Sequence, residues 1–239
     1  QGKWTEELAK ALSEAKTLTE VEDIYRPYKP KRKTRATIAI AKGLEGLADV
    51  LIAQSKSFKI AEEALKYITE EVPTIEEAIA GAKDIIAERI SDDADLRKDL
   101  RQTIENKAFL TCVLLENENN LTYETYANFK QEVSKVPSHR ILAINRGEKE
   151  KCLKVDVELN EELALKIIEK HFKKNNEDTD KLMEETIVDA YDRLLFPSLE
   201  RECRSDLTDK ANEQAIKMFE VNLKPLLMEA PLKNNIILG

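Results

Sequence analysis

The chain has 239 residues, of which 42% are hydrophobic and 35% are charged, and its formal net charge is -8. This balance is typical of a soluble, folded protein with a buried core. No run of about 18 apolar residues occurs, so no membrane span is expected. The charged, amphipathic N-terminal stretch does not resemble a signal peptide. The overall acidity excludes a protein whose whole surface is basic and coats nucleic acid, so any contact with nucleic acid must be local.

Cysteine and glycine usage limits the chemistry further. The three cysteines are far apart in the sequence, which fits reduced thiols in a cytoplasmic protein. Together with only two histidines they offer no zinc-site spacing. A phosphate-binding loop and a dinucleotide fingerprint are also missing. The sequence therefore predicts no cofactor, no metal and no catalytic residue.

Apolar residues at helical spacing predict a mostly α, multihelical scaffold. Capping-box patterns at Thr19–Glu22 and Thr74–Glu77 mark two helix starts, and Gly43 suits a left-handed helix end. A later helix is expected to begin at Asp92 and Asp93 and to continue to Leu115. The remaining helices are expected near residues 4–15, 36–40, 44–51, 61–68, after 160, 182–195 and 208–228.

The second half of the chain carries the exceptions to this helical pattern. Residues 152–159 alternate between apolar and polar and predict one minor strand. Its expected partner is the apolar run at 235–238. Ser138 is expected to cap a short helix that Gly147 ends, and Pro197 and Pro225 are expected to break or kink the last helices. A polar stretch near 117–121 marks a candidate sub-boundary within the chain.

The segment at residues 25–35 contains six basic residues and no acidic one. Lysines and arginines there can neutralise phosphates, and Tyr25 and Tyr28 can stack on bases. The alternative is a structural clamp, in which the tyrosines are buried between helices and the arginines pair with acidic helix faces. The two readings are compatible if Tyr25 and Arg26 anchor the segment and its later residues stay exposed. The candidate nucleic-acid-binding residues are Arg26, Lys29, Lys31, Arg32, Lys33 and Arg35, with Arg140 and Arg146 as additions.

Two other patterns invite a functional interpretation and do not support one. Ser138 and His139 are adjacent, but neighbouring positions at a helix start point in different directions, so a helix cap explains them better than catalysis. Asp92, Asp93 and Asp95 lack the glycine and the further ligands of a calcium loop. They are expected to stabilise a helix N-terminus.

Three groups of segments together resemble the Tex family of bacterial transcription accessory proteins. The first is Val21–Arg35 followed by Gly43–Ala48. The second is Val136–Arg140 with Arg146–Glu150. The third is Asp189–Glu200 with Asn222–Leu223 and Ala230–Leu232. Each motif alone is weak, but their order and spacing match and they span nearly the whole chain.

The resemblance implies a place in a larger protein. Tex-like proteins are multidomain cytoplasmic proteins related to a eukaryotic transcription elongation factor. They combine a helical region with an RNase H-like domain, helix-hairpin-helix elements and an RNA-binding OB-fold domain. On this resemblance, residues 1–239 are the helical region alone, a non-catalytic scaffold that supports RNA binding by the whole protein. The alternative is a protein-interaction module that docks RNA polymerase or another factor through a helical groove. A positive patch around Lys29 to Arg35 would favour nucleic acid, and an exposed apolar groove would favour a protein partner.

Overall fold

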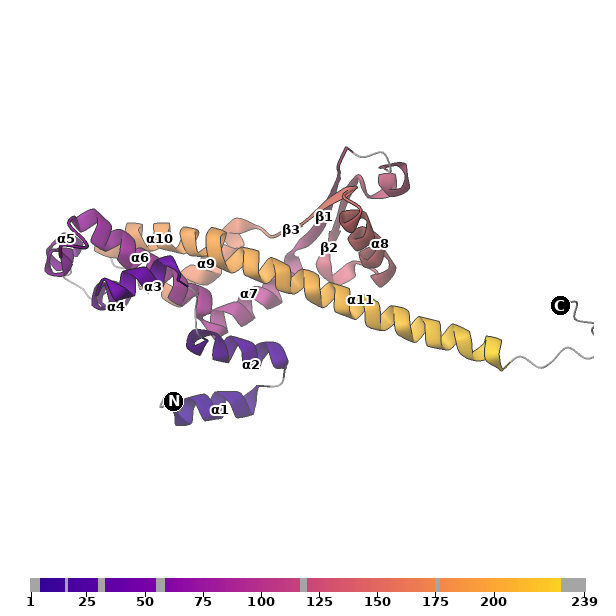
Figure 1. The fold of residues 1–239 in the computed structure, drawn as a ribbon, viewed down its shortest axis with the longest axis horizontal. Coiled ribbons are helices and arrows are strands. Elements are labelled where there is room, and N and C mark those ends of the chain that lie inside the picture. Colours follow the sequence, from indigo (N-terminus) through magenta and orange to yellow (C-terminus); the bar gives the residue numbers. More distant parts are fainter. Residues whose placement is uncertain are drawn as a thin grey trace, which may run out of the picture. The chain divides into compact units, whose positions relative to one another are not determined.

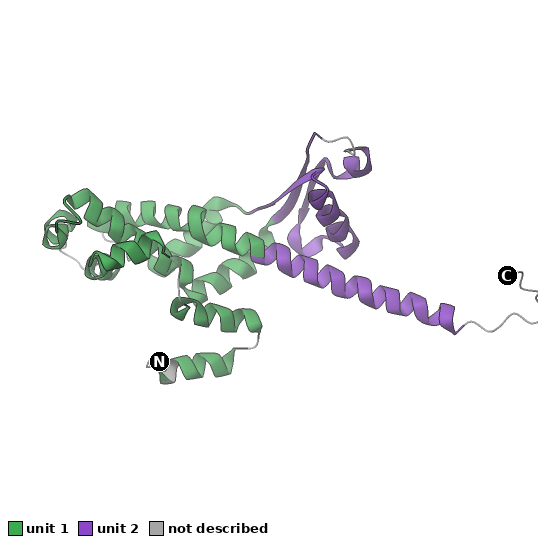
Figure 2. Cartoon of the chain, viewed as in Figure 1, with its two compact units in different colours: residues 1–108, 159–201 green, residues 109–158, 202–239 purple. Residues whose placement is uncertain are grey.

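A computed structural model of the chain describes residues 5–15, 17–29, 33–54, 59–116, 120–174 and 177–228. The fold is mostly α with one small antiparallel sheet, as the sequence predicts (Figure 1). The chain divides into two compact units, one of residues 1–108 and 159–201 and the other of residues 109–158 and 202–239 (Figure 2). The sub-boundary considered near 117–121 stays a prediction, since residues 117–119 lie outside the described part.

Unit 1 is built from helices around α6. Its α-helices are α1 (Glu6–Glu14), α2 (Leu18–Tyr25), α3 (Arg35–Ala41), α4 (Glu45–Ala53), α5 (Ile60–Ala64), α6 (Ile75–Asp92), α7 (Ala94–Lys107), α9 (Glu161–Phe172) and α10 (Glu177–Ala190). α6 packs against α3, α4 and α10. Its inward face is apolar and fully buried, with Ala78, Ala82, Ile86 and Ile90 at helical spacing. This amphipathic pattern is the one that the sequence shows.

The helix starts follow local capping chemistry. Thr17, and not Thr19, begins α2: its hydroxyl oxygen accepts a hydrogen bond from the Glu20 N–H (3.2 Å) and the Glu20 carboxylate accepts one from the Thr17 N–H (3.3 Å). The capping box expected at Thr19–Glu22 was therefore wrong by two residues. Thr74 caps α6 as predicted. Gly43 has a φ of 81°, which confirms its left-handed conformation.

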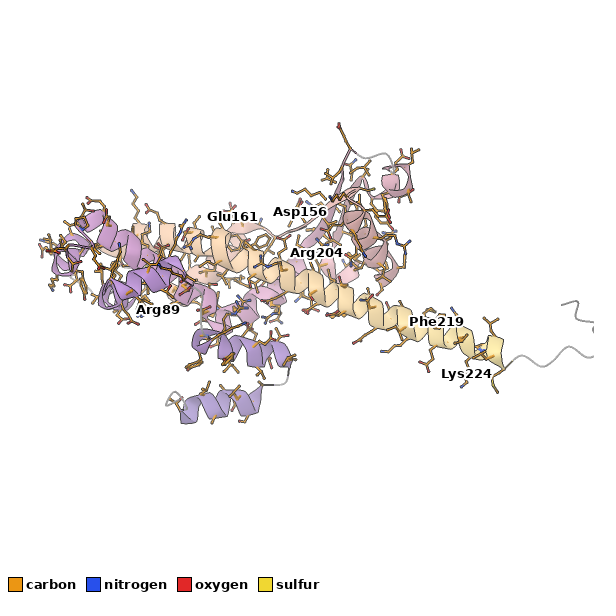
Figure 3. The ribbon with its side chains drawn as sticks, viewed as in Figure 1. Arg89, Asp156, Glu161, Arg204, Phe219 and Lys224 are labelled. Atoms are coloured by element: carbon orange, nitrogen blue, oxygen red, sulfur yellow. The ribbon has the colours of Figure 1, made fainter. Side chains whose placement is uncertain are left out.

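Unit 2 contains the sheet, helix α8 (Ser138–Lys149) and helix α11 (Phe196–Leu227) from residue 202 onward. The sheet has strands β1 (Phe109–Leu114), β2 (Asn128–Glu132) and β3 (Leu153–Glu158) in the order β2-β1-β3, and both pairings are antiparallel. Cys112 lies opposite Phe129 on one side and opposite Val155 on the other. Arg204 of α11 donates to the Val155 carbonyl oxygen (3.1 Å) and pairs with the Glu148 carboxylate, which ties α11 to β3 and α8 (Figure 3).

Strand β3 confirms the predicted minor strand, and strand β1 corrects another prediction. Residues 109–114 were expected to extend the helix that begins at Asp93, but α7 ends at Lys107 and these residues pair with β3. Their run of phenylalanine, β-branched and aliphatic residues suits a strand paired on both sides. The pairing expected between β3 and residues 235–238 stays a prediction, because those residues lie outside the described part.

The two residues that were predicted to bound α8, Ser138 and Gly147, have other roles in the structure. Gly147 lies buried inside α8 and does not end it: a Cβ there would come within 2.7 Å of Leu153 Cδ1, so the glycine allows close packing. Ser138 is the first residue of α8 and Pro137 holds the N-cap position, with no side-chain cap.

Residues 191–195 form a π-helical turn, in which the Phe196 N–H donates to the Tyr191 carbonyl oxygen. α11 follows this turn directly.

The π-helical turn explains why Pro197 does not break the last helix. Pro197 has no N–H to donate, and its ring would collide with the preceding turn of a regular α-helix. A wider π-helical turn directly before it relieves that collision. Helix α11 continues to Leu227 with Pro225 near its end, so the break expected between residues 195 and 208 was wrong.

Candidate nucleic-acid interface

The basic segment follows Asp23 in the chain, and Asp23 belongs to a buried ion-pair cluster in unit 1. Asp23 of α2 is 3% exposed and accepts hydrogen bonds from Arg97 Nε (2.9 Å) and Arg101 Nη2 (2.7 Å) of α7. Arg97 is fully buried and also donates to the Ser91 carbonyl oxygen and the Ser198 hydroxyl oxygen, both at 3.2 Å. The Asp23 cluster, meaning these five residues, joins α2 to α6, α7 and the start of α11.

The sequence analysis did not single out the Asp23 cluster, although a signal for it exists. Arg97 stands next to Leu96 and three residues before Leu100, both of which are fully buried, so it lies on the apolar side of α7. Arg101 follows four residues later on the same side. Two arginines on the buried side of a helix predict a buried acid. Only the fold shows that the acid is Asp23, which is 74 positions away from Arg97.

Residues 26–28 form one 3₁₀ turn immediately after α2, with Pro27 near its start. Arg26 is anchored there, with its Nε 4.0 Å from the Asp23 carboxylate and its side chain 33% exposed. Tyr25 and Tyr28 are 52% and 38% exposed. The clamp reading is therefore right about the anchored arginine and wrong about buried tyrosines. Asp23 holds the start of the turn, and two tyrosines are exposed there, Tyr25 at the end of α2 and Tyr28 in the turn.

The other basic residues of the segment differ in their surroundings. Lys29 and Lys33 are exposed, and Lys31 and Arg32 lie outside the described residues. Arg35, the first residue of α3, borders a hollow of about 370 Å³ that Asp84 also lines. The pKa of Asp189 is lowered, first by hydrogen bonds from Arg193 and further by the charge of Arg35.

Arg35 therefore faces acidic groups that balance part of its charge. Arg193 joins the same group, donating to Asp84 (3.0 Å) as well as to Asp189. Lys29 and Lys33 are the described residues of the segment best placed to contact phosphates.

Arg140 and Arg146 belong to unit 2 and form a separate candidate. Arg140 donates to Gln131 Oε1 (3.1 Å), and its guanidinium lies 5.9 Å from the centre of the Phe129 ring. Arg146 is exposed on α8. Near the start of α8, Ser138 shares a shallow hollow of about 230 Å³ with four residues of α11. These residues are Lys210, Glu213, Gln214 and Lys217. Two lysines that the sequence analysis did not consider thus lie near the helix that carries Arg140.

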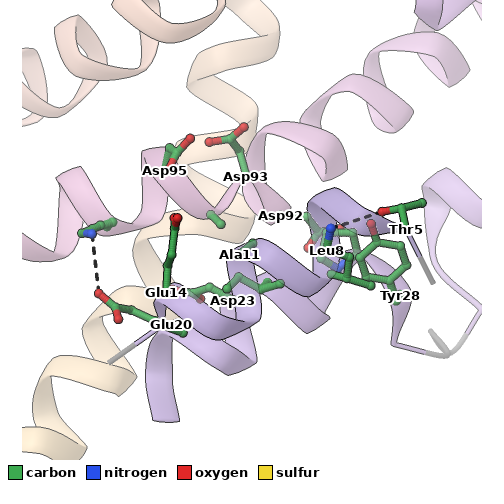
Figure 4. Close-up of a pocket in the computed structure, with 15 residues that line it drawn as sticks. Thr5, Leu8, Ala11, Glu14, Glu20, Asp23, Tyr28, Asp92, Asp93 and Asp95 are labelled. Atoms are coloured by element: carbon green, nitrogen blue, oxygen red, sulfur yellow. Dashed lines mark hydrogen bonds and ion pairs between the residues drawn. The ribbon is translucent and has the colours of Figure 1, made fainter. Parts of the chain in front are cut away.

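An acidic groove of about 530 Å³ lies between α1, α2 and the α6–α7 junction (Figure 4). Its apolar lining comes from Leu8, Ala11, Ala15, Ile24 and Pro27, and its carboxylates come from Glu14, Glu20, Asp23, Asp92, Asp93 and Asp95. Lys98 also lines the groove, and its Nζ lies 3.5 Å from the Glu20 carboxylate. Asp93 caps α7 by accepting from the Leu96 N–H (2.7 Å), as expected for an acid at a helix start. Arg97 and Arg101 balance the charge of Asp23 and Lys98 that of Glu20, so the groove's excess negative charge comes from the other carboxylates. The groove reaches the basic segment at Tyr28.

Metal binding and membrane spanning each need a feature that the described residues do not provide. No group of three or more His, Cys, Asp or Glu side chains there could hold a metal ion. None of the helices in the described ranges is long and apolar enough to cross a membrane. Burial raises the pKa of the Cys112 thiol to about 11, so this thiol is protonated at neutral pH.

These observations describe a helical module with a small sheet and a basic, aromatic surface segment. A family model described as Tex central region-like matches residues 55–219, and the chain belongs to this family. The resemblance seen in the sequence is thereby confirmed. The match covers most of both units and leaves out α1 to α4.

Curated relatives agree with this assignment. The chain is 44% identical to the uncharacterized protein YdcI of Bacillus subtilis, with all of the chain and 34% of that protein aligned. It is 33% identical to the transcriptional accessory protein Tex of Neisseria gonorrhoeae, where all of the chain aligns with 32% of the relative. It is 29% identical to the human S1 RNA-binding domain-containing protein 1, again over the whole chain and 26% of the relative. The chain thus spans about a third or less of the length of these relatives.

Proposed function

We propose that this chain is a non-catalytic helical scaffold within a cytoplasmic transcription accessory protein, and that it supports RNA binding by the whole protein. The names of two relatives, a transcriptional accessory protein and an S1 RNA-binding domain-containing protein, support this class of function. The observation that carries the proposal is the 3₁₀ turn at residues 26–28, which the buried Asp23 cluster holds at the surface of unit 1.

The turn and the residues around it have the chemistry of an auxiliary RNA contact. Lys29 and Lys33 are exposed cations that can release counterions from a phosphate backbone. Tyr25 and Tyr28 expose rings on which unpaired bases can stack, and each such stack contributes about 1–3 kcal/mol. Because Asp23 fixes Arg26 at the start of the turn, this part of the segment loses little ordering entropy when RNA binds.

Salt-dependent binding of single-stranded RNA tests the proposal. We compare the unaltered chain with Lys29→Glu/Lys33→Glu and with Lys166→Glu/Lys170→Glu, two exposed lysines of α9 in the same unit. Both variants change the net charge equally. The first should weaken binding and reduce the slope of log K against log salt by about 1.4, because two phosphate contacts are lost. Equal effects of both variants, or no salt dependence of the unaltered chain, would contradict a specific contact.

A second candidate function is docking of RNA polymerase or another protein without direct RNA contact. The acidic groove favours this alternative, because its apolar lining suits a protein side chain and its carboxylates repel nucleic acid. Glu14→Lys/Asp95→Lys should then weaken capture of purified RNA polymerase and leave RNA binding in place. Glu161→Lys/Glu162→Lys, on the exposed first turn of α9, is the matched control. Loss of capture with the control pair as well would argue against the groove.

A further inference from the structure

Arg97 joins two segments that lie far apart in the sequence. Its Nε donates to Asp23 Oδ1 (2.9 Å), its Nη2 donates to Ser198 Oγ (3.2 Å), and its Nη1 donates to the Ser91 carbonyl oxygen (3.2 Å). Asp23 and Ser198 belong to the first and the third group of segments that resemble the Tex family. Side chains from α2 and from α11 therefore converge on one buried guanidinium.

The start of α11 places Ser198 against α7. Helix α11 begins in unit 1 and continues in unit 2 from residue 202, so Ser198 lies in the same unit as the rest of the Asp23 cluster (Figure 2). The π-helical turn at residues 191–195 directly precedes α11. A π-helical turn holds one more residue than an α-helical turn, so it rotates the side chains that follow by about 100°. The turn that carries the chain past Pro197 thus also sets the direction of Ser198.

Three contacts fix the plane of the Arg97 guanidinium. The group is planar, and its N–H donors form a rigid fork. Arg97 is fully buried, so water does not readily replace a contact that it loses. With Ser198 and Ser91 holding the two terminal nitrogens, Nε is aimed at Asp23 Oδ1. The same oxygen lies 4.0 Å from Arg26 Nε. The orientation of Arg97 therefore sets the position of the carboxylate oxygen that anchors Arg26.

We propose that Ser198 is a positioning residue for the RNA contact at the 3₁₀ turn of residues 26–28. It acts through Arg97 and Asp23 on Arg26, at the start of the turn, and does not itself contact RNA. The inference rests on the proposed function, because it gives Ser198 a part in RNA binding.

The backbone amide of Lys29 reports the state of the turn without RNA. Its N–H donates to the carbonyl oxygens of Tyr25 (3.1 Å) and Arg26 (3.3 Å), which closes the turn. This N–H exchanges with solvent only when these bonds open, so slow exchange means a closed turn. The measurement is independent of RNA binding and so separates this inference from the proposed function.

Hydrogen exchange of the Lys29 N–H, measured by NMR on the chain without RNA, is the first test. Ser198→Ala removes the oxygen that accepts from Arg97, so the amide should exchange about fivefold faster or more, the equilibrium effect of one ordinary hydrogen bond. Ser198→Thr keeps a hydroxyl and should restore slow exchange. Thr186→Ala is the matched control. It removes another buried hydroxyl of unit 1, which donates to the Leu182 carbonyl oxygen outside the Asp23 cluster, and should leave the Lys29 exchange unchanged.

Binding of a fluorescent poly(U) oligonucleotide at low salt is the second test. Ser198→Ala should weaken binding about fivefold or more, which corresponds to the loss of one base stack. Ser198→Thr and Thr186→Ala should bind as the unaltered chain does. Circular dichroism checks that each variant remains folded.

Two results would overturn the role of Ser198 and leave the proposed function standing. One is an unchanged Lys29 exchange in Ser198→Ala. The other is poly(U) binding that Lys29→Glu/Lys33→Glu weakens and Ser198→Ala does not. Equal effects of Ser198→Ala and Thr186→Ala would also contradict the proposal, because a general loss of stability would then explain both. If the unaltered chain does not bind poly(U), the proposed function itself fails and this inference fails with it.

Discussion

Replacing Asp23 with alanine is the sharpest test of how the basic segment is held. The side chains of Asp23 and Arg97 are 5% and 0% exposed, and their closest atoms are 2.9 Å apart. Removing the carboxylate leaves the Arg97 charge buried without its acid, which costs about 3–5 kcal/mol in comparable sites. Arg101 is 23% exposed and can be solvated, so it should add little to this loss.

Urea unfolding monitored by circular dichroism at 222 nm measures this loss directly. The loss is a large fraction of the ~5–15 kcal/mol that stabilises a typical domain. Glu62→Ala, which removes an exposed ion pair with Lys59, should cost less than about 1 kcal/mol and is the control.

A double substitution separates charge burial from simple loss of packing. Asp23→Leu combined with Arg97→Met removes both buried charges and keeps most of the volume, so much of the stability lost in Asp23→Ala should return. If Asp23→Ala costs no more than Glu62→Ala, the Asp23 cluster does not hold α2 against α7. The account of the anchored turn would then fail.

Three further predictions concern local packing and pH. Gly147→Ala should destabilise the protein by about 1–3 kcal/mol in urea unfolding, because its Cβ would approach Leu153 Cδ1 to 2.7 Å; a gain in stability would contradict the close packing. Thr17→Ala should cost about 1 kcal/mol and Thr19→Ala clearly less, because only Thr17 caps α2. Burial raises the Cys112 pKa from 9.0 to about 11, so the unfolded thiol ionises first and its contribution to stability should fall between these pH values. A Cys112→Ala variant should lack that part of the pH dependence.

The candidate site shows where inference from the sequence reaches its limit. Lys29 and Lys33 could be identified from the sequence because a run of basic residues in an acidic chain is a local signal. Their anchor could not, because Asp23 and Arg97 meet only after α2 packs on α7. Arg35 belongs to the same basic run, yet the fold places it around the same hollow as Asp84 and near enough to Asp189 to lower the pKa of that carboxyl, which the sequence does not reveal.

The sequence by itself determined the helical character of the chain, the strand at 153–158, the left-handed Gly43 and the family. These depend on spacings within a few turns of helix or on linear motifs, so they can be read along the chain. Only the tertiary structure decided that residues 109–114 form a strand, because a short apolar run pairs or coils according to its neighbours in space. Tertiary packing likewise decided that a π-helical turn carries the chain past Pro197.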